Sequence, residues 1–352
     1  MPQIIDILTA AMRMDGSDVF LIPGAEVSMK VGGHVMPIME GVLKPEDTMS
    51  LLAQVYALDG RSSERVLAGG DDDFSFSVRG VGRFRCNAFR QRNSMAMVLR
   101  VVTFELPDPQ KFHIPDSVMA LAGVTKGLVL VTGPAGSGKS TTLACLINRI
   151  NETRCDHIIT VEDPIEFIHP HKKSLVSQRE IEHDTENYAS ALRAALRQAP
   201  DVILIGEMRD FTTIQTAITA AETGQLVLST LHTVGAANTV DRIIDVFPAA
   251  QQQQVRVQLS MVLKAVVSQQ LVPSQSGGRE AAFEVMTATP AIQNMIREGK
   301  AHQMDNVIYA SANAGMRAMD ADLMRLCKDG VISAENAILY ATNPELMAKK
   351  LN

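Results

Sequence analysis

The stretch Gly133-Pro134-Ala135-Gly136-Ser137-Gly138-Lys139-Ser140 matches the phosphate-binding pattern G-x-x-x-x-G-K-[ST]. The apolar run 128–131 precedes it, and a helical pattern from Thr141 to Ile150 follows it. Backbone N–H groups of such a loop, and of the helix that starts there, converge on one anion. A chance glycine-rich loop would lack this strand and this helix. The stretch therefore predicts a P-loop that binds ATP with Mg²⁺.

Within the loop, two side chains have predicted roles. Lys139 would hold the β- and γ-phosphates, and the Ser140 hydroxyl would ligate Mg²⁺. The predicted nucleotide-binding residues are Gly133, Pro134, Ala135, Gly136, Ser137, Gly138, Lys139, Ser140 and Thr141.

Acidic residues follow two further apolar runs. Glu207 comes after the run 203–205, and Glu162, Asp163 and Glu166 come after the run 158–161. Ligands bind at the carboxyl ends of the strands in a parallel α/β sheet. Glu207, Glu162 and Asp163 are therefore candidate Mg²⁺ ligands beside Ser140, and one of the carboxylates could take the proton of an attacking water. His232 follows a third run, 226–230, and is a candidate γ-phosphate sensor.

The region around these motifs alternates between strands and helices, which predicts an α/β domain with a parallel sheet covered on both faces. From Pro248 onward we expect one long helix over Ala249–Leu271, and several helices between about Pro290 and Leu351. The expected strands are Gly127–Thr132, His157–Val161, Val202–Ile205 and Leu226–Thr230, and the expected helices are Ser140–Ile150, Tyr188–Gln198 and Thr212–Glu222.

The N-terminal part has a different pattern, with a helix over Met1–Met14 and then short alternating runs such as Phe74–Val78. A helical run, Pro45–Ala57, is expected to pack on one face of the resulting sheet. Three prolines lie between Leu106 and Pro115. We therefore predict an α+β domain over 1–106, a linker over 107–116, and the α/β domain with a C-terminal helical subdomain over 117–352.

The composition narrows the function class. Of 352 residues, 46% are hydrophobic and 20% charged, the formal net charge is −6 and Trp is absent, so the cationic and aromatic surface of a nucleic-acid binder is not expected. The four cysteines form no C-x-x-C pair, which argues against a zinc site or a disulfide framework and favours a reducing compartment. No run approaches the roughly 18 apolar residues of a membrane span. Membrane contact is therefore expected to come through a partner.

With these segments in order, the chain resembles the secretion and pilus ATPase superfamily of RecA-like hexameric motors. The motif of residues 133–140 is similar to its Walker A motif and Leu231-His232-Thr233 to its His box. Glu162-Asp163-Pro164-Ile165-Glu166 is similar to its Asp box, and Gly206-Glu207-Met208-Arg209-Asp210 to its Walker B motif. The resemblance covers nearly the whole chain.

Within the superfamily the chain most resembles the type IV pilus retraction ATPases, the PilT family. Besides 206–210, the segments 82–90 and 291–298 (GRFRCNAFR and AIQNMIRE) carry this resemblance, and the C-x-x-C element usual in extension ATPases is absent. The chain departs from the family at Gln225 and Gln293, where a His and an Arg are common. Gln cannot become cationic, so charge contacts at these positions would become neutral hydrogen bonds.

The resemblance implies a RecA-like P-loop domain behind a small N-terminal α+β domain that is PAS-like. It implies that Glu166 is the general base, that Glu207 supports Mg²⁺ and water, and that His232 is the sensor. It also makes Arg83, Arg85 and Arg90 candidates to reach the nucleotide of a neighbouring subunit, although their spacing equally fits a solvated basic strand.

The implied function is that of a cytoplasmic homo-hexamer, peripheral at the inner face of the cytoplasmic membrane, that depolymerises pilin and drives twitching motility. Its implied partners are the inner-membrane pilus platform protein and a second retraction-type ATPase, with no nucleic acid. Three alternatives stay open: a pilus-extension or secretion ATPase, an accessory PilT-like paralogue that hydrolyses poorly, and, as the weakest, a P-loop kinase for a small molecule.

Overall fold

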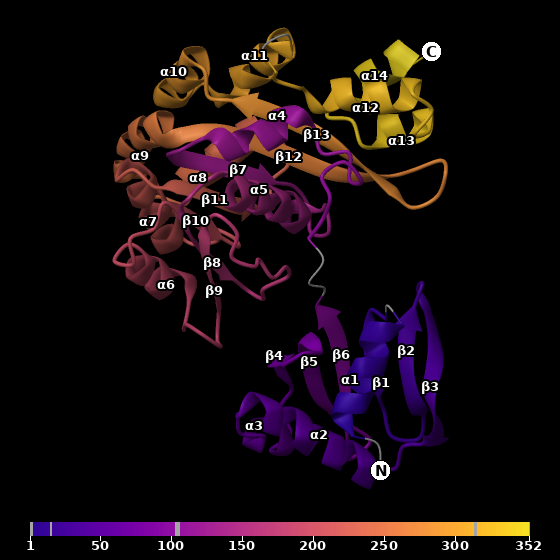
Figure 1. Cartoon of the computed structure of the whole chain (residues 1–352). Coiled ribbons are helices and arrows are strands. Elements are labelled where there is room, and N and C mark those ends of the chain that lie inside the picture. The colour runs from indigo at the N-terminus through magenta and orange to yellow at the C-terminus, as the bar shows by residue number, and fades with distance from the viewer. Residues whose placement is uncertain (1–2, 15, 103–105, 313–314, 352) are drawn as a thin grey trace. The chain divides into compact units, whose positions relative to one another are not determined.

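The computed structural model describes residues 3–14, 16–102, 106–312 and 315–351. The chain divides into two compact units, one of Met1–Glu105 with Glu166–Ile168 and the other of Leu106–Ile165 with His169–Asn352. Each unit has its own sheet and its own apolar core (Figure 1). The predicted classes, α+β and RecA-like α/β, are confirmed.

The first unit is built on an antiparallel sheet with the strand order β3-β2-β1-β6-β5-β4. In β4, the apolar residues Phe74, Phe76 and Val78 are buried on one face, as the period of two of a strand requires. On the other face Asp73 and Ser77 are exposed and Ser75 is buried. The elements are α1 (Ile4–Arg13), β1 (Asp18–Leu21), β2 (Glu26–Val31), β3 (His34–Val42), α2 (Pro45–Asp59), α3 (Glu64–Leu67), β4 (Asp72–Val78), β5 (Gly82–Gln91) and β6 (Ser94–Val102).

Helix α2 packs against β6 and β4 and closes this core. Pro45 occupies its first turn, where no helical hydrogen bond is lost, and the Asp47 carboxylate accepts from the Lys44 N–H at 2.8 Å. Gly60 ends the helix with φ of 71°, a left-handed conformation that glycine adopts without steric cost. The helix predicted from Pro45 is confirmed and runs two residues further than expected.

The second unit contains a sheet with the strand order β13-β12-β7-β11-β10-β8-β9, in which every neighbouring pair is parallel except β12 and β13. Its strands are β7 (Gly127–Thr132), β8 (His157–Glu162), β9 (Leu175–Glu180), β10 (Val202–Ile205), β11 (Leu226–Leu231), β12 (Leu263–Pro273) and β13 (Arg279–Thr287). Its helices are α4 (Asp116–Met119), η1 (Ala120–Gly123), α5 (Lys139–Thr153), α6 (Tyr188–Ala195), α7 (Phe211–Glu222), α8 (Ala236–Asp245), α9 (Ala249–Val262), α10 (Pro290–Glu298), η2 (Ala301–Gln303), α11 (Met304–Ala310), α12 (Met319–Lys328), α13 (Ala334–Leu339) and α14 (Pro344–Leu351).

Strand β7 is buried on both faces of this sheet. Leu128 and Leu130 belong to the core that α7, α8 and α9 share, whereas Val129 and Val131 belong to the core on the side of α5. Successive side chains of a strand point to opposite faces, so a strand covered on both sides needs an uninterrupted apolar run. The prediction of a sheet with two covered faces is confirmed.

The long helix predicted over Ala249–Leu271 is wrong. Helix α9 ends at Val262, and the remaining residues form β12, which pairs with β7 on one side and with β13 on the other. A short apolar run fits a buried strand and a buried helix equally well, and no Gly or Pro marks the change at Leu263. The strand that pairs directly with β7, the strand that leads into the P-loop, was therefore not predicted from the sequence.

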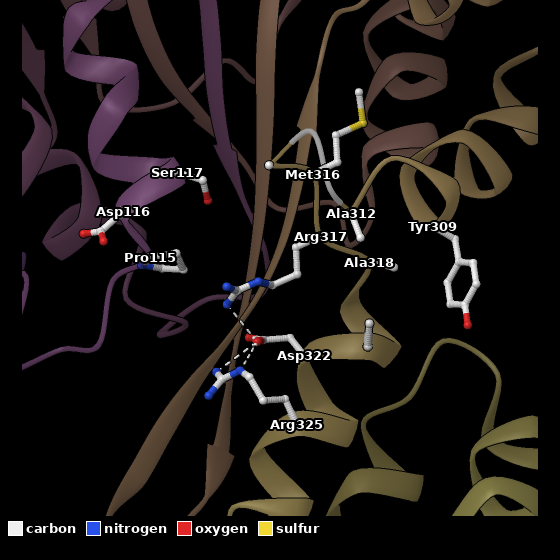
Figure 2. Close-up of a pocket in the computed structure, with 12 residues that line it drawn as sticks. Pro115, Asp116, Ser117, Tyr309, Ala312, Met316, Arg317, Ala318, Asp322 and Arg325 are labelled. Atoms are coloured by element: carbon white, nitrogen blue, oxygen red, sulfur yellow. Dashed lines mark hydrogen bonds and ion pairs between the residues drawn. The ribbon is translucent and has the colours of Figure 1, made fainter.

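The C-terminal helices are joined to the sheet through a buried carboxylate. Asp322 of α12 accepts a hydrogen bond from the Phe283 N–H of β13 at 2.9 Å, and its side chain is fully buried. Arg317 and Arg325 both donate to its Oδ1, at 2.8 and 2.9 Å. Figure 2 marks these contacts with dashed lines. A cavity of about 650 Å³ lies between these arginines and the start of α4 at Asp116. The residues that line this cavity are not those at the strand ends that carry the predicted nucleotide site.

Every helix in the described parts of the chain falls short of the length and apolarity needed to cross a bilayer.

Candidate nucleotide site

Four neighbouring parallel strands bring the predicted motifs to one sheet edge. In the register, Thr132 of β7 lies beside Leu231 of β11, and Ile205 of β10 lies beside Val161 of β8. The P-loop, the His box, the Walker B acid and the Asp box therefore emerge side by side where these strands end. Grouping at the carboxyl ends of parallel strands is the usual geometry of an α/β ligand site.

The P-loop has a backbone that needs glycine at its first and third glycine positions. Gly133 has φ of 140° and Gly138 has φ of 87°. A Cβ on Gly133 would overlap the carbonyl oxygen of Gln269, and a Cβ on Gly138 would lie 2.8 Å from Gln269 Nε2. Because these two positions have no side chain, Gln269 of β12 can pack directly against the loop.

Lys139 is the first residue of α5 and is 8% exposed. Its Nζ donates to the carbonyl oxygens of Gly133 and Pro134, both at 2.9 Å, so its cation reaches back across the loop. The N–H groups of Lys139, Ser140 and Thr141 belong to the first helical turn, where no intrahelical acceptor exists. Together they form a cluster of donors with positive charge, suited to phosphate.

Two hydroxyl groups near this loop fit a site shaped for a further ligand. The buried Oγ of Ser137 and the buried Oγ1 of Thr132 have no hydrogen-bond partner among the described residues. Buried hydroxyls are normally paired, so their environment favours a polar group from a substrate. The donor set, the Ser140 hydroxyl and nearby carboxylates fit a nucleotide triphosphate with Mg²⁺, a cation that keeps few protein ligands. In the described residues, no three His, Cys, Asp or Glu side chains form a metal-binding group by themselves.

The Walker B acid and the His-box histidine are in direct contact. His232 Nε2 donates to Glu207 Oε2 at 3.1 Å, and Arg209 Nε donates to the same oxygen at 2.6 Å. The Glu207 side chain is 13% exposed, whereas half of the His232 side chain is exposed. One enclosed carboxylate therefore positions a histidine and an arginine that still reach solvent.

The Asp box is held at the end of β8. Glu162 Oε1 accepts from the Thr160 hydroxyl at 2.6 Å and from Gln178 Nε2 at 3.3 Å. The Glu180 carboxylate accepts from the Ile165 N–H at 2.9 Å, which ties the following loop to β9. Asp163 is exposed at the same strand end.

Tyr188, at the start of α6, was not identified from the sequence. Its hydroxyl lies 2.8 Å from where a Cβ on Gly206 would stand. Burial, with the negative charges of Asp163, Glu207 and Glu162, raises the pKa of Tyr188 above its ordinary value. It therefore stays a neutral hydroxyl between the Asp box and Walker B, and a Tyr at a helix start carries no sequence signal for this placement.

Glu166 and the three candidate arginines belong to the first unit. Glu166 is exposed and groups with that unit, and Arg90 of β5 is also exposed. Arg85 makes a bidentate pair with Asp73 of β4, at 2.9 and 2.6 Å. Arg83 Nη1 donates to the Ser77 hydroxyl at 3.3 Å. The catalytic roles of these four residues stay predictions.

A cavity of about 120 Å³ adjoins the P-loop on the side of Gly138 and Thr141. Residues 111–114, part of the predicted linker, form one wall, and β13 forms another. His113 Nδ1 lies 2.7 Å from Glu280 Oε1 across this wall. This contribution of residues 111–114 to a cavity was not predicted from the sequence.

The two glutamines that depart from the family pattern make ordinary local contacts. Gln225 Oε1 accepts from the Thr223 hydroxyl at 2.8 Å, just before β11. At Gln293 the contact is made by the backbone N–H, which donates to the Thr289 carbonyl at 2.9 Å in the first turn of α10 and does not depend on the side chain. Neither contact involves a charged group.

Comparison with known proteins agrees with this geometry. The family model of the Type II/IV secretion system protein matches residues 1–337. The type IV pilus retraction ATPase PilT of Pseudomonas aeruginosa is 44% identical over 343 residues, which cover 97% of this chain and 99% of that protein. The type IV pilus ATPase PilU of the same organism is 41% identical over 336 residues, which cover 95% of this chain and 87% of PilU.

Among solved structures, the crystal structure of the pilus retraction motor PilT with bound ADP matches with a TM-score of 0.90 at 44% identity, covering 99% of this chain and 100% of that chain. The chain therefore belongs to the Type II/IV secretion system protein family and, within it, to the PilT family of pilus ATPases.

Proposed function

We propose that this chain hydrolyses MgATP and, as a homo-hexamer, powers retraction of type IV pili. The observation that carries the proposal is the convergence of the P-loop, the Glu207 and His232 pair, and the Asp box at one edge of the parallel sheet. An adjoining lysine and helix start supply the positive charge that a triphosphate requires.

ATP binds first through groups that this chain already presents. Lys139 Nζ exchanges the carbonyl oxygens of Gly133 and Pro134 for phosphate oxygens, because an anion is the stronger acceptor. The Ser140 hydroxyl, together with Glu207, Glu162 and Asp163 directly or through water, would hold Mg²⁺. That cation supplies charge neutralisation at the β- and γ-phosphates.

The acids then assist hydrolysis. Glu166 takes a proton from the attacking water, and Glu207 orients the groups around the γ-phosphate. His232 is the sensor because its Nε2–H can donate to Glu207 or to a phosphate oxygen. When the γ-phosphate leaves, His232 returns to Glu207, and the loop that leads to α8 follows.

Full activity requires a neighbouring subunit. An arginine of the next N-terminal unit, drawn from Arg83, Arg85 and Arg90, stabilises the transition-state charge, an effect of roughly 10³ to 10⁵ in rate in other P-loop enzymes. Arg85 would have to give up its pair with Asp73 to do so. Turnover per subunit therefore rises with protein concentration as rings form.

The work is delivered to the inner-membrane pilus platform protein, with the ring at the cytoplasmic face of the membrane and a second retraction-type ATPase as a further partner. Pilin depolymerisation and twitching are the outcome. Support comes from the 44% identity to a retraction ATPase over almost the whole of both chains. A net charge of −6 disfavours nucleic acid as the track.

A second candidate function is that of an accessory ring. Two type IV pilus ATPases of the same organism, PilT and PilU, have similar identities to this chain, 44% and 41%, so these identities do not by themselves distinguish a main motor from an accessory ring. An accessory ring would bind ATP with the same residues and assist a separate motor.

The test is deletion of this chain in its own host, followed by complementation. Wild type is expected to restore twitching, whereas Lys139→Ala is expected to leave cells piliated and immobile. A deletion strain that still twitches, but more weakly than wild type, would favour the accessory ring. Restored twitching with Lys139→Ala, or unchanged twitching in the deletion strain, would contradict the proposal.

A further inference from the structure

Gln269 lies on β12 directly beside the P-loop. Ser268 pairs with Thr132 at the end of β7, so Gln269 is level with Gly133, the first residue of the loop. It is 3% exposed. Glutamine is mostly found on surfaces, so a buried amide at this position needs partners and invites a functional explanation.

The oxygen and the nitrogen of the Gln269 side-chain amide face two different neighbours. Its Oε1 accepts a hydrogen bond from the Thr142 hydroxyl of α5 at 2.7 Å. Its Nε2 lies on the side of Gly138, 2.8 Å from where a Cβ on that glycine would stand. Among the described residues, Thr142 is the one side-chain hydrogen-bond partner that the amide has. The two N–H groups of Nε2 are therefore left for a group outside the chain.

The position of Nε2 points to one part of a nucleotide. Gln269 lines the cavity of about 120 Å³ together with Gly138, Thr141 and Thr142. Lys139 and Ser140 face the β- and γ-phosphates and Mg²⁺, and P-loop amides cradle the α- and β-phosphates. The cavity beyond Gly138 and Thr141 is thus at the nucleoside end, where the α-phosphate joins the ribose.

We infer that Gln269 is a nucleotide-binding residue whose Nε2 donates a hydrogen bond to the α-phosphate. This inference rests on the proposed ATPase function. Thr142 orients the amide, since its hydroxyl occupies Oε1 and leaves Nε2 toward the substrate. Because ATP and ADP share the α-phosphate, the contact serves binding of both.

The decisive experiment compares two substitutions of Gln269. A purely structural role and a role in nucleotide binding predict opposite orders for the loss of ADP affinity in the two variants. Gln269→Glu keeps an acceptor for Thr142 but turns a negative charge toward the phosphate. Gln269→Met keeps the length of the side chain and loses every hydrogen bond. If Gln269 only braced α5, the Glu variant would be the milder one. If Nε2 binds phosphate, the Glu variant is the more severe one.

The measured quantities are the ADP dissociation constant by calorimetry, the steady-state KM and kcat for ATP, and the melting temperature. We expect ADP affinity to fall by about tenfold in Gln269→Met, the size of one hydrogen bond to a charged group, and by more in Gln269→Glu. KM should rise far more than kcat falls, since the contact exists before and during the reaction. Gln270→Met, the same change on the neighbouring residue of β12, is the matched control and should leave ADP affinity as it is.

Two outcomes would overturn the inference: ADP affinity within about twofold of wild type in Gln269→Met, or a Glu variant that binds ADP better than the Met variant. If Gln269→Glu does not fold, the Met variant and its melting temperature decide alone, because lost affinity at unchanged stability supports binding. Lys139→Ala is measured in parallel. Lost turnover there, with unchanged Gln269 variants, would contradict this inference and leave the proposed function standing.

Discussion

His232 and Glu207 are hydrogen-bonded at 3.1 Å although they are 25 positions apart in the chain. They meet because β11 and β10 are parallel neighbours and each residue follows the end of its strand. Because a carboxylate can only accept, this hydrogen bond requires that the Nε2 nitrogen of His232 carries a proton. The acid that we propose to support Mg²⁺ and the histidine that we propose to sense the γ-phosphate are thus in direct contact.

This contact predicts non-additive effects on turnover. We expect Glu207→Gln to lower kcat on the order of a hundredfold and His232→Ala about tenfold, within the range of positioned acid and base groups. The double variant should be within about threefold of Glu207→Gln, because residues that act as a unit are not additive. Steady-state kinetics on all four proteins test this. A double variant with the full product of both losses would mean that the two residues act independently.

Glu166 is predicted to be the general base. Glu166→Gln should lower turnover by at least about a hundredfold, the lower end of the effect of a catalytic base. Binding of ATP should survive, because the P-loop is untouched. Glu335→Gln, an exposed glutamate in the first turn of α13, serves as the control. Unchanged turnover in Glu166→Gln would remove this residue from the proposed role.

How much of this site could be predicted from the sequence depends on the range of the interaction. The P-loop, β7 and β10 were predicted because each is a local pattern: a glycine motif, or an apolar run buried on both faces. The Glu207 and His232 contact depends on which strands are neighbours, and this order is not written in any local pattern. The hydrogen bond therefore appears only in the folded sheet.

The region after α9 shows where local patterns fail. Residues 263–271 were predicted as helix, although they form most of β12. The apolar side chains of this strand satisfy either period, and pairing with β7 and β13 decides the outcome. Gln269 and Ser268 lie on β12, so the wrong assignment also left their contacts unpredicted. Gln269 accepts from the Thr142 hydroxyl of α5, and Ser268 accepts from the Gly235 N–H in the loop after His232.

Asp322 is predicted to matter for stability. Asp322→Ala removes the acceptor of the buried Phe283 N–H and the shared partner of Arg317 and Arg325. We expect a loss of about 3 kcal/mol in the free energy of unfolding, the lower end for a broken buried pair, because both guanidinium groups reach solvent. Urea denaturation of Asp322→Ala against Asp329→Ala, an exposed partner of Arg325, measures it. Equal losses in both variants would contradict the prediction.

Glu284 predicts a pH dependence of stability. Its Oε1 accepts from the Ala236 N–H at 2.8 Å. Burial first, and the nearby charges of Asp305 and Asp320, raise the pKa of this carboxyl above its ordinary value of 4.5. Because the folded state holds the proton more tightly, this group favours folding below pH 4.5, and that contribution is lost as the pH rises through the raised pKa.

Glu284→Gln should therefore gain stability relative to wild type as the pH rises above 4.5, and the gain should level off above the raised pKa. Urea melts of both proteins between pH 4 and 8, taken as a difference, isolate this residue from other acids. A difference that does not change with pH would show that the pKa of Glu284 is the same in the folded and unfolded states.

The proposed hydrolysis depends on phosphate being held by Lys139 and the first N–H groups of α5. The most direct test is steady-state ATP turnover of purified Lys139→Ala beside Lys126→Ala, an exposed lysine just before β7. We predict that Lys139→Ala loses at least about a hundredfold in turnover, the cost of one electrostatic group aimed at transition-state charge, and that Lys126→Ala matches wild type. Normal turnover by Lys139→Ala would contradict the account.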